Sequence, residues 1–306
     1  KLSALFVWST SSFLPTGQSA FIFGTLTYFI IVFCNSLVVL TIAVSKRLHR
    51  PMFLLLINLP ISDILGASGF FPQLVFSILT QNRIISTSAC ITQAFLIHLY
   101  GAGNLLILSV MAYDRYIAIC NPLKYNTIMT SNFVIRIISL IWLLDFVVIT
   151  LLFALTLRFN ICRTDIEDLY CNNPSFQKLS CGDNRVSNYY GIFITCMLNG
   201  GSLLIIAYTY AQILRTCVMN NNTDSRKKAF QTCGTHLVVF LVLQINSAFT
   251  IISHRFQNVS PFLRRACGVS ILIFPPLLDP IIYGLKTKEL KKSIITFLKR
   301  QVGPTK

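Results

Sequence analysis

Seven apolar runs, each long enough to cross a lipid bilayer, constrain what this chain can fold into. They lie at residues 21–45, 52–79, 88–118, 133–157, 188–214, 229–253 and 265–285. Only helices and closed barrels satisfy every backbone group inside a bilayer, and a helix needs about 20 apolar residues to span it. Prolines in the second and seventh runs predict kinks, because neighbouring helices can satisfy the freed backbone groups. We therefore expect an all-α membrane protein, a bundle of seven transmembrane helices.

The composition supports a single membrane domain. Hydrophobic residues make up 54% of the 306 residues and charged residues 12%, with a mean hydropathy of +0.66, too apolar for an ordinary soluble domain. We expect one domain over 1–306, with an extracellular segment 1–20, the bundle 21–285 and a cytoplasmic tail 286–306. No cleavable signal peptide is predicted in 1–20, so the first span would direct insertion.

The positions of the basic residues predict the orientation. Of the 26 Lys and Arg residues, 17 follow the first, third and fifth spans or lie in the tail. The side richer in Lys and Arg faces the cytoplasm, so we expect the N-terminus outside. The net charge of +16 then reflects this asymmetry and attraction to anionic lipid, which favours membrane lipid over nucleic acid as a partner.

Four of the ten cysteines face outward in this topology, where oxidising conditions favour disulfides. They are Cys90, at the start of the third span, and Cys162, Cys171 and Cys181, in the loop after the fourth. Four cysteines allow three pairings, and the residues alone do not choose among them. A zinc site is less favoured, because no CxxC pair or nearby His accompanies them, so we predict no metal site.

Polar residues interrupt several spans. Asp63 and Asp279 lie in the second and seventh, and Asn35 and Asn104 in the first and third. Ionisable groups at such depth are costly and are functional candidates, so a cation-holding or water-filled site competes with a structural hydrogen-bond network. Asp145 in the fourth span is interpreted as a packed contact between helices.

His98 lies on the third span beside the small residues 101–103. Small residues allow either close helix packing or a cavity beside the imidazole, which can donate or accept hydrogen bonds. No nucleophile elbow, zinc-binding helix or phosphate-binding loop is present, so we expect no enzyme activity. The seventh span has no central lysine for a retinal Schiff base.

Motifs along nearly the whole chain give a resemblance to a known family. They are Asn35, Asp63, Asp114-Arg115-Tyr116, Trp142, Asp279-Pro-x-x-Tyr283, a basic amphipathic segment 287–299, Pro51-Met52-Phe53, Met111 to Cys120 with the following Asn121 to Tyr125, the loop ending Leu179-Ser-Cys181, and Lys228 to Leu237. In this order they resemble an odorant receptor, a branch of the rhodopsin-like G-protein-coupled receptors.

The resemblance implies a small odorant that binds between spans three, five, six and seven and activates a stimulatory G protein, raising cAMP. It also implies the plasma membrane of sensory cilia and disulfides Cys90–Cys171 and Cys162–Cys181. The matching ligand positions are Ile97, His98, Gly101, Ala102, Ile194, Thr195, Leu198, Gln244, Ser247, Ala248, Ile251, Val269 and Leu272. The alternatives are a receptor of the same class for a lipid or peptide and, less favoured, a seven-span transporter.

Ile97 stands where amine receptors carry an Asp, which implies a neutral or weakly polar ligand. His98, Gln244, Ser247 or Thr195 would position it. Gln244 itself replaces the Tyr that is usual in the family.

The resemblance makes Arg115 a cytoplasmic switch. Asp114 would hold it at rest, and release would let it meet Tyr210 and Tyr283. The basic segment 226–228 provides no acid to hold Arg115, so His236 and Tyr116 are candidates for further restraint.

Two departures from the family pattern concern the polar core. Asn104 stands where the family usually has an acid, and Asp279 replaces the more common Asn. We expect that Asp63, Asn104 and Asp279 form a site for a cation or proton, with sodium as the candidate ion and no other cofactor.

Overall fold

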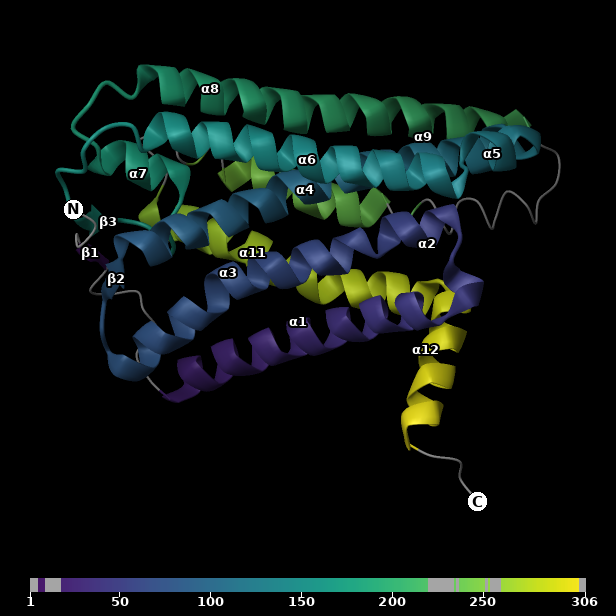
Figure 1. Ribbon diagram of the computed structural model, residues 1–306, viewed down its shortest axis with the longest axis horizontal. Helices are drawn as coiled ribbons and strands as arrows, with labels where there is room; N and C mark the ends of the chain where they lie inside the picture. The colour runs from purple at the N-terminus through teal and green to yellow at the C-terminus, as the bar shows by residue number, and fades with distance from the viewer. Residues whose placement is uncertain are drawn as a thin grey trace.

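The computed structural model describes residues 5–8, 18–219, 234, 237–250, 253 and 260–302. Its long helices pack side by side into an elongated bundle (Figure 1). The elements are β1 (Leu5–Trp8), α1 (Gln18–Val44), the 3-10 helix η1 (Lys46–Leu48), α2 (Pro51–Leu56), α3 (Asn58–Thr80), β2 (Ile84–Ser86), α4 (Thr87–Cys120), α5 (Pro122–Ile128), α6 (Ser131–Thr156), β3 (Asp165–Ile166), α7 (Asn173–Leu179), α8 (Arg185–Thr195), the π-helical turn η2 (Cys196–Gly200), α9 (Gly201–Met219), α11 (Pro261–Lys286) and α12 (Lys288–Val302). A further apolar helix covers Leu237–Thr250.

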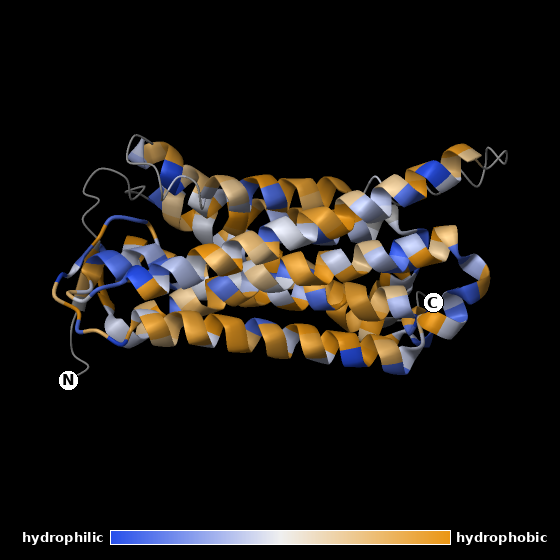
Figure 2. Cartoon of the chain, turned by 90° about the horizontal axis from the view of Figure 1, so that it is seen from above, coloured by the Kyte–Doolittle hydropathy of each residue, from blue (hydrophilic) through white to orange (hydrophobic). Residues whose placement is uncertain are grey.

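The helices confirm the seven-helix bundle. Six helical stretches of the described chain are long and apolar enough to cross a membrane, and the helix Leu237–Thr250 lies within the sixth predicted run. Hydrophobic residues cover the middle of the helices, and hydrophilic residues gather toward their ends and in the loops (Figure 2). Only 28% of the most apolar window of α6 is buried, so most of this helix faces outward, where lipid would cover it.

Two spans differ in detail from the predicted runs. The second is divided into α2 and α3 at Ile57, three residues before Pro60, which cannot donate a helical hydrogen bond. The fifth contains the π-helical turn η2 between α8 and α9. By contrast, Pro72 lies inside α3, and Pro275 inside α11, without ending either helix.

A small sheet closes the disulfide-bonded end of the bundle. Strand β1 pairs antiparallel with β2 and parallel with β3. Its Phe6 is fully buried and packs edge-to-face on Phe176, with ring centroids 6.1 Å apart. The short, irregular strands gave no periodic signal in the sequence, so this sheet was not predicted.

Two disulfides join this end together. They connect Cys90 with Cys171 and Cys162 with Cys181, the pairing implied by the family resemblance, with Cα–Cα distances of 5.4 and 5.6 Å. The first fastens the loop after α6 to the start of α4. The second closes a hairpin-like segment within that loop.

Gly66 permits a close approach between α3 and α4. A Cβ atom there would lie 2.5 Å from Cγ of Tyr100, so no other residue fits without moving the ring. Tyr100 is 1% exposed and donates a hydrogen bond of 2.9 Å to the carbonyl of Ile271. One glycine thus lets a tyrosine link α4 to α11 through the centre of the bundle.

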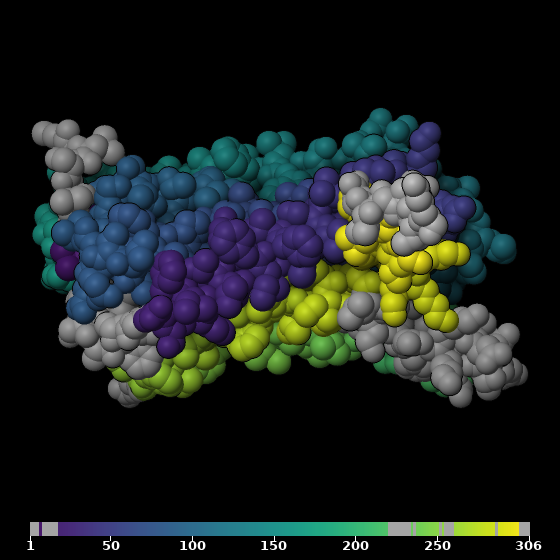
Figure 3. Space-filling model, turned by 90° about the horizontal axis from the view of Figure 1, so that it is seen from below, coloured from purple at the N-terminus to yellow at the C-terminus, as the bar shows by residue number. Residues whose placement is uncertain are grey.

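At the opposite end, α12 leaves the bundle at a steep angle (Figure 1). It lies against the end of α1, as the yellow and purple surfaces in Figure 3 show. Leu290 is fully buried at the start of α12 and anchors the helix to the inner core.

Candidate functional site

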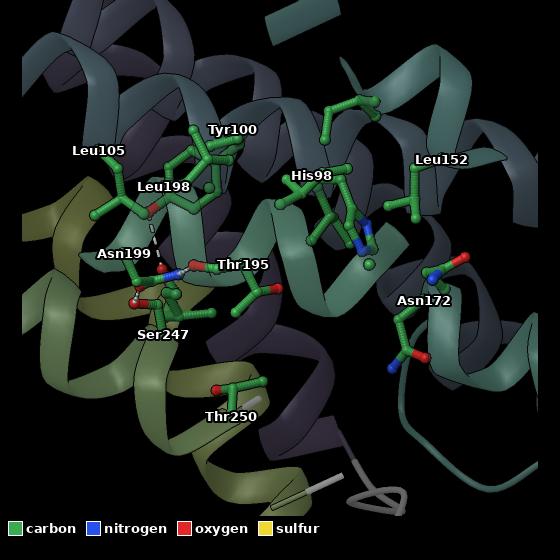
Figure 4. A pocket seen from close by; sticks show the side chains of 18 of the residues that line it. His98, Tyr100, Leu105, Leu152, Asn172, Thr195, Leu198, Asn199, Ser247 and Thr250 are labelled. Atoms are coloured by element: carbon green, nitrogen blue, oxygen red, sulfur yellow. Dashed lines mark hydrogen bonds between the residues drawn. The ribbon is translucent and has the colours of Figure 1, made fainter. Parts of the chain in front are cut away.

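A cavity of about 210 Å³ lies inside the bundle toward the disulfide-bonded end. Residues of α4, α6, α8, η2 and α11, the loop before and start of α7, and the helix Leu237–Thr250 surround it (Figure 4). The lining residues are Ile97, His98, Tyr100, Gly101, Ala102, Leu105, Ile149, Leu152, Tyr170, Asn172, Asn173, Pro174, Gly191, Ile194, Thr195, Leu198, Asn199, Ser247, Thr250 and Ile271.

Most of the predicted ligand positions meet at this cavity. Eight of them line it: Ile97, His98, Gly101, Ala102, Ile194, Thr195, Leu198 and Ser247. A Cβ on Gly101 would meet nothing within 4 Å, so this glycine leaves open space rather than a close helix contact. Ile251 lies outside the described residues.

Four predicted positions do not line the cavity: Gln244, Ala248, Val269 and Leu272. Leu272 is fully buried in a hydrophobic cluster with Phe70 and Tyr100, and Val269 packs against the same cluster. Ile271 lines the cavity in their place. The sequence pattern identified α11 correctly but not the face that it turns toward the cavity.

The fourth span contributes to the cavity, which the resemblance did not lead us to expect. Ile149 and Leu152 line it from α6. They share one buried face of the helix with Asp145 and Thr156. Residues three and four apart lie on the same helix face, so these two polar residues could have identified the inward-facing side of the span.

Asn199 and Ser247 form a hydrogen bond at the inner end of the cavity, where the fifth and sixth spans meet (Figure 4). The amide nitrogen of Asn199 donates to the carbonyl of Thr195 at 3.1 Å, and its oxygen accepts from Ser247 Oγ at 2.8 Å. Gln244 donates to the carbonyl of Asn199 at 3.2 Å. Gln244 therefore stands behind Asn199 and does not line the cavity.

The π-helical turn η2 contains Asn199. Single π-turns inside α-helices insert an extra residue and are frequent at functional sites. Two glycines, Gly200 and Gly201, follow at once, and a Cβ on either would meet no atom within 4 Å. The sequence analysis missed Asn199; the polar residue beside a Gly-Gly pair in an apolar span was the available signal.

His98 is the cavity's imidazole. Its Nδ1 lies 2.8 Å from the carbonyl oxygen of Ala94, one turn earlier in α4. A carbonyl only accepts hydrogen bonds, so Nδ1 of His98 carries a proton. The ring packs edge-to-face on Phe153, with centroids 5.4 Å apart, which fixes its orientation.

The loop before α7 covers the outer side of the cavity. The backbone nitrogen of Cys171 donates to the side chain of Gln93 at 2.8 Å, and Gln93 in turn donates to the carbonyl of Gly69 at 3.1 Å. Tyr170 is buried beside them and lines the cavity. Burial, with the charge of Asp168, raises the pKa of the Tyr170 hydroxyl, so it stays neutral.

Ion pairs tie the same loop to the start of α11. Arg264 donates to Asp168 at 3.1 Å and to Glu167 at 3.3 Å. Lys178 donates to Glu167 at 2.6 Å. The hydrogen bond and charge of Lys178, with Arg264 nearby, lower the pKa of the Glu167 carboxyl despite the opposing effect of partial burial.

The predicted polar core lies deep in the bundle. Asp63 is fully buried and accepts a hydrogen bond of 3.3 Å from the amide of Asn104. Asp279 is 3% exposed and within electrostatic reach of Asp63. Among the described residues, Asp63 Oδ2 and Asp279 Oδ1 have no hydrogen-bond partner. Two buried carboxylates with unsatisfied oxygens form a donor set that suits a hard cation or a shared proton.

Two other buried polar residues have separate roles. Asn35 donates to the carbonyls of Pro276 and Ile31, each at 2.9 Å, and thereby links α1 to α11. Asp145 is 1% exposed and packs against Gly103, where a Cβ would lie 3.1 Å from its Oδ2. Gly103 therefore leaves the room that this carboxylate occupies between α6 and α4.

The predicted switch residues meet at the other end of the bundle. Asp114, fully buried, forms an ion pair with Arg115, and Tyr125 donates to its other oxygen at 2.8 Å. Tyr210 and Tyr283 are both buried in the neighbouring hydrophobic core.

The remaining parts of the predicted switch are Tyr116, His236 and the basic segment 226–228. Tyr116 packs on Tyr208, with ring centroids 6.1 Å apart. His236 and the basic segment 226–228 lie outside the described residues. Tyr125, which bonds to Asp114, was not among the predicted switch residues. It belongs to a motif of the family resemblance, but no role was assigned to it.

Comparison with known proteins identifies the family. A family model described as olfactory receptor matches residues 24–301. The chain belongs to the olfactory receptor family. It is 33% identical to human olfactory receptor 52B2 over 88% of this chain and 84% of that protein, and 34% identical to human olfactory receptor 52J3 over 88% and 86%.

A solved structure also resembles this receptor. Squid rhodopsin superimposes with a TM-score of 0.68 and 17% sequence identity, covering 93% of this chain and 86% of that one. This likeness concerns the fold alone. Together with the family match, it identifies the chain as a multi-pass membrane receptor and not an enzyme.

The ion pairs of Glu167 predict a specific pH dependence of stability. Because its pKa is lowered in the folded receptor, its stabilisation is complete above the unfolded value of about 4.3 and is lost as pH falls through the folded value. The melting temperature of the solubilised receptor minus that of Glu167→Gln should stay constant from about pH 7 to 5 and shrink below about pH 4. A difference already lost near pH 6 would contradict this assignment.

Proposed function

We propose that this olfactory receptor binds a small, neutral or weakly polar odorant in the cavity between α4, α6 and α8 and then activates a stimulatory G protein, raising cAMP. The observation that carries the proposal is the cavity of about 210 Å³ beneath the disulfide-bonded loop. No Asp, Glu, Lys or Arg occurs among its described lining residues. A charged ligand would lose its hydration there without gaining a counter-ion.

The size of the cavity favours a small odorant over a peptide or a lipid. An apolar protein cavity of about 150 Å³ is large enough to bind benzene. A cavity of about 210 Å³ therefore suits a compact organic molecule with few atoms beyond one ring. A peptide or an acyl chain would need a longer groove than the one that these lining residues enclose.

The polar atoms around the cavity support a ligand with one hydrogen-bonding group. The His98 imidazole lines the cavity and can exchange hydrogen bonds with an alcohol or another hydroxyl group. Thr195 and Ser247 add hydroxyl groups at the inner end. Gln244, expected to touch the ligand directly, bonds the backbone of Asn199, and we propose that it acts on the ligand through this residue.

A ligand changes signalling only if it binds one state of the receptor more tightly than the other. Ser247 and Gln244 both belong to the helix Leu237–Thr250 and bond to Asn199 of the fifth span. An odorant that replaces one of these hydrogen bonds would shift the sixth span relative to the fifth. We infer that this motion releases Arg115 from Asp114 for the G protein.

The distribution of Lys and Arg supports an extracellular N-terminus and a cytoplasmic α12. In that orientation the disulfides face the oxidising exterior, as their chemistry requires. We place the receptor in the plasma membrane of sensory cilia, as the family resemblance implies.

Filling the cavity tests the binding site. Gly101→Leu should project a side chain into open space, because a Cβ there meets no atom within 4 Å. Its odorant response in a cAMP reporter assay should fall by at least about tenfold while surface expression is kept.

Gly201→Leu is the matched control, since Gly201 also has open space around its Cβ position but does not line the cavity. Equal responses of the two variants to an odorant panel would contradict the site. A strongest response to a cationic amine would contradict the proposed ligand class.

The Asp114–Arg115 ion pair predicts ligand-independent activity when it is broken. Asp114→Asn should raise cAMP without odorant severalfold, because a hydrogen bond to a charged group contributes about 1.5–3 kcal/mol. Tyr125→Phe should act in the same direction but less strongly, since it removes a single hydrogen bond. Tyr113→Phe, on the exposed side of α4, is the control. A well-expressed but silent Asp114→Asn receptor would refute the role of the pair.

We propose that a sodium ion or a shared proton occupies the site formed by Asp63, Asn104 and Asp279. Either would offset the repulsion between two buried carboxylates. Asp279→Asn should then abolish the dependence of ligand-free signalling on sodium concentration and pH. If signalling of this variant keeps the dependence of the unmodified receptor, the site does not act in this way.

A further inference from the structure

A second cavity, of about 830 Å³, lies at the α12 end of the bundle, remote from the odorant cavity. It is bounded by the end of α1, by η1 and by one face of α12, which Figure 3 shows against the end of α1. The residues around it are Thr41, Val44, Ser45, Lys46, Arg47, Leu48, Arg50, Glu289, Lys292, Ser293, Thr296 and Phe297. We call this space the α1–α12 cleft.

The α1–α12 cleft carries a clear excess of positive charge. Four of its residues are cationic and one is acidic. Within the described chain, Arg50 alone among the four forms an ion pair, at 3.3 Å from Glu289, and both side chains are more than half exposed. Exposed pairs of this kind contribute little and exchange readily. Lys46, Arg47 and Lys292 are also exposed and face the cleft without an acidic partner in the described residues.

Thr41 is a buried polar residue of the cleft lining. This residue is 1% exposed, and its hydroxyl has no hydrogen-bond partner among the residues that the structure describes. A buried hydroxyl without a partner costs free energy unless a ligand or water satisfies it. Ser45 and Ser293 add two further hydroxyls to the lining.

The depth of the cleft indicates where its ligand comes from. α1 ends at Val44, which is 61% exposed and lines the cleft, so the cleft opens where the first span leaves the hydrocarbon. Phe297 adds a second apolar side chain beside the basic residues. A molecule that fits must carry several negative charges and also an apolar part held in the membrane.

We propose that the α1–α12 cleft binds the phosphorylated headgroup of an anionic membrane lipid of the phosphoinositide type. Lys46, Arg47 and Lys292 contact its phosphates, and the hydroxyls of Thr41 and Ser293 complete the hydrogen bonding. The acyl chains lie along the exposed surface of α1. Only the assignment of the lipid to the cytoplasmic leaflet rests on the proposed orientation of the receptor.

The test measures lipid binding to the purified full-length receptor in detergent, without odorant. A dioctanoyl phosphatidylinositol bisphosphate is titrated against the unmodified receptor and against the double variant Lys46→Gln/Arg47→Gln. The affinity of the variant should fall roughly 25-fold, because each Lys or Arg near an anionic headgroup contributes about a factor of five. Glu289→Gln should bind more tightly, since it removes the cleft's one acid.

The matched control is Lys291→Gln/Lys299→Gln, which removes two exposed charges of α12 that do not line the cleft. An equal loss in both double variants would show diffuse surface attraction and overturn the proposal. Equal binding of phosphatidylserine, or binding of free inositol trisphosphate or inorganic phosphate but not of the lipid, would overturn it as well. Because no odorant is present, failure here leaves the odorant cavity untouched, and failure of an odorant panel leaves this result intact.

Discussion

A polar group buried in a bilayer has no water to bond to, and this constraint organises the whole receptor. Several of the buried polar side chains satisfy it by linking one span to another. Trp142 donates a hydrogen bond of 2.9 Å to Asn58 and joins α6 to α3. Asn35 joins α1 to α11 by donating to the carbonyl of Pro276. The neighbouring prolines of α11 have no N–H group, which weakens the hydrogen bonding within that helix. Polar residues therefore mark the contacts that define the bundle.

In the part of the chain that the structure describes, the buried polar atoms without a hydrogen-bond partner are informative for the same reason. The unsatisfied oxygens of Asp63 and Asp279 lie together near the centre, and those of Asp145 face Gly103. Ionisable groups at such depth are costly, and Asp63 and Asp279 are the two carboxylates of the proposed cation or proton site.

The disulfide-bonded end of the bundle differs from the polar core, because covalent and hydrogen bonds fasten it. The Cys90–Cys171 disulfide spans 81 residues, and closing a loop of that length removes about 4.5 kcal/mol of unfolded-chain entropy in the simplest model. Gln93 reinforces it by bonding both Cys171 and the backbone of α3. The disulfide and Gln93 thus hold the loop that covers the cavity in place.

The sequence was sufficient for the spans, because an uninterrupted apolar run permits few other structures. It also located eight of the cavity residues, since motif positions fix the register of each helix. It could not reveal the π-helical turn, which rotates Asn199 relative to an ideal helix. The inward face of α6, with Ile149 and Leu152, was not predicted either, although Asp145 and Thr156 mark it. Such features depend on tertiary packing, which the local sequence pattern does not determine.

The most direct test of the account is a cryo-EM structure of the receptor with an activating odorant bound. The account predicts ligand density between α4, α6 and η2, in contact with His98, Thr195 and Ser247, beneath the loop that contains Tyr170. Density at another site, with this cavity collapsed or filled by its own side chains, would contradict it.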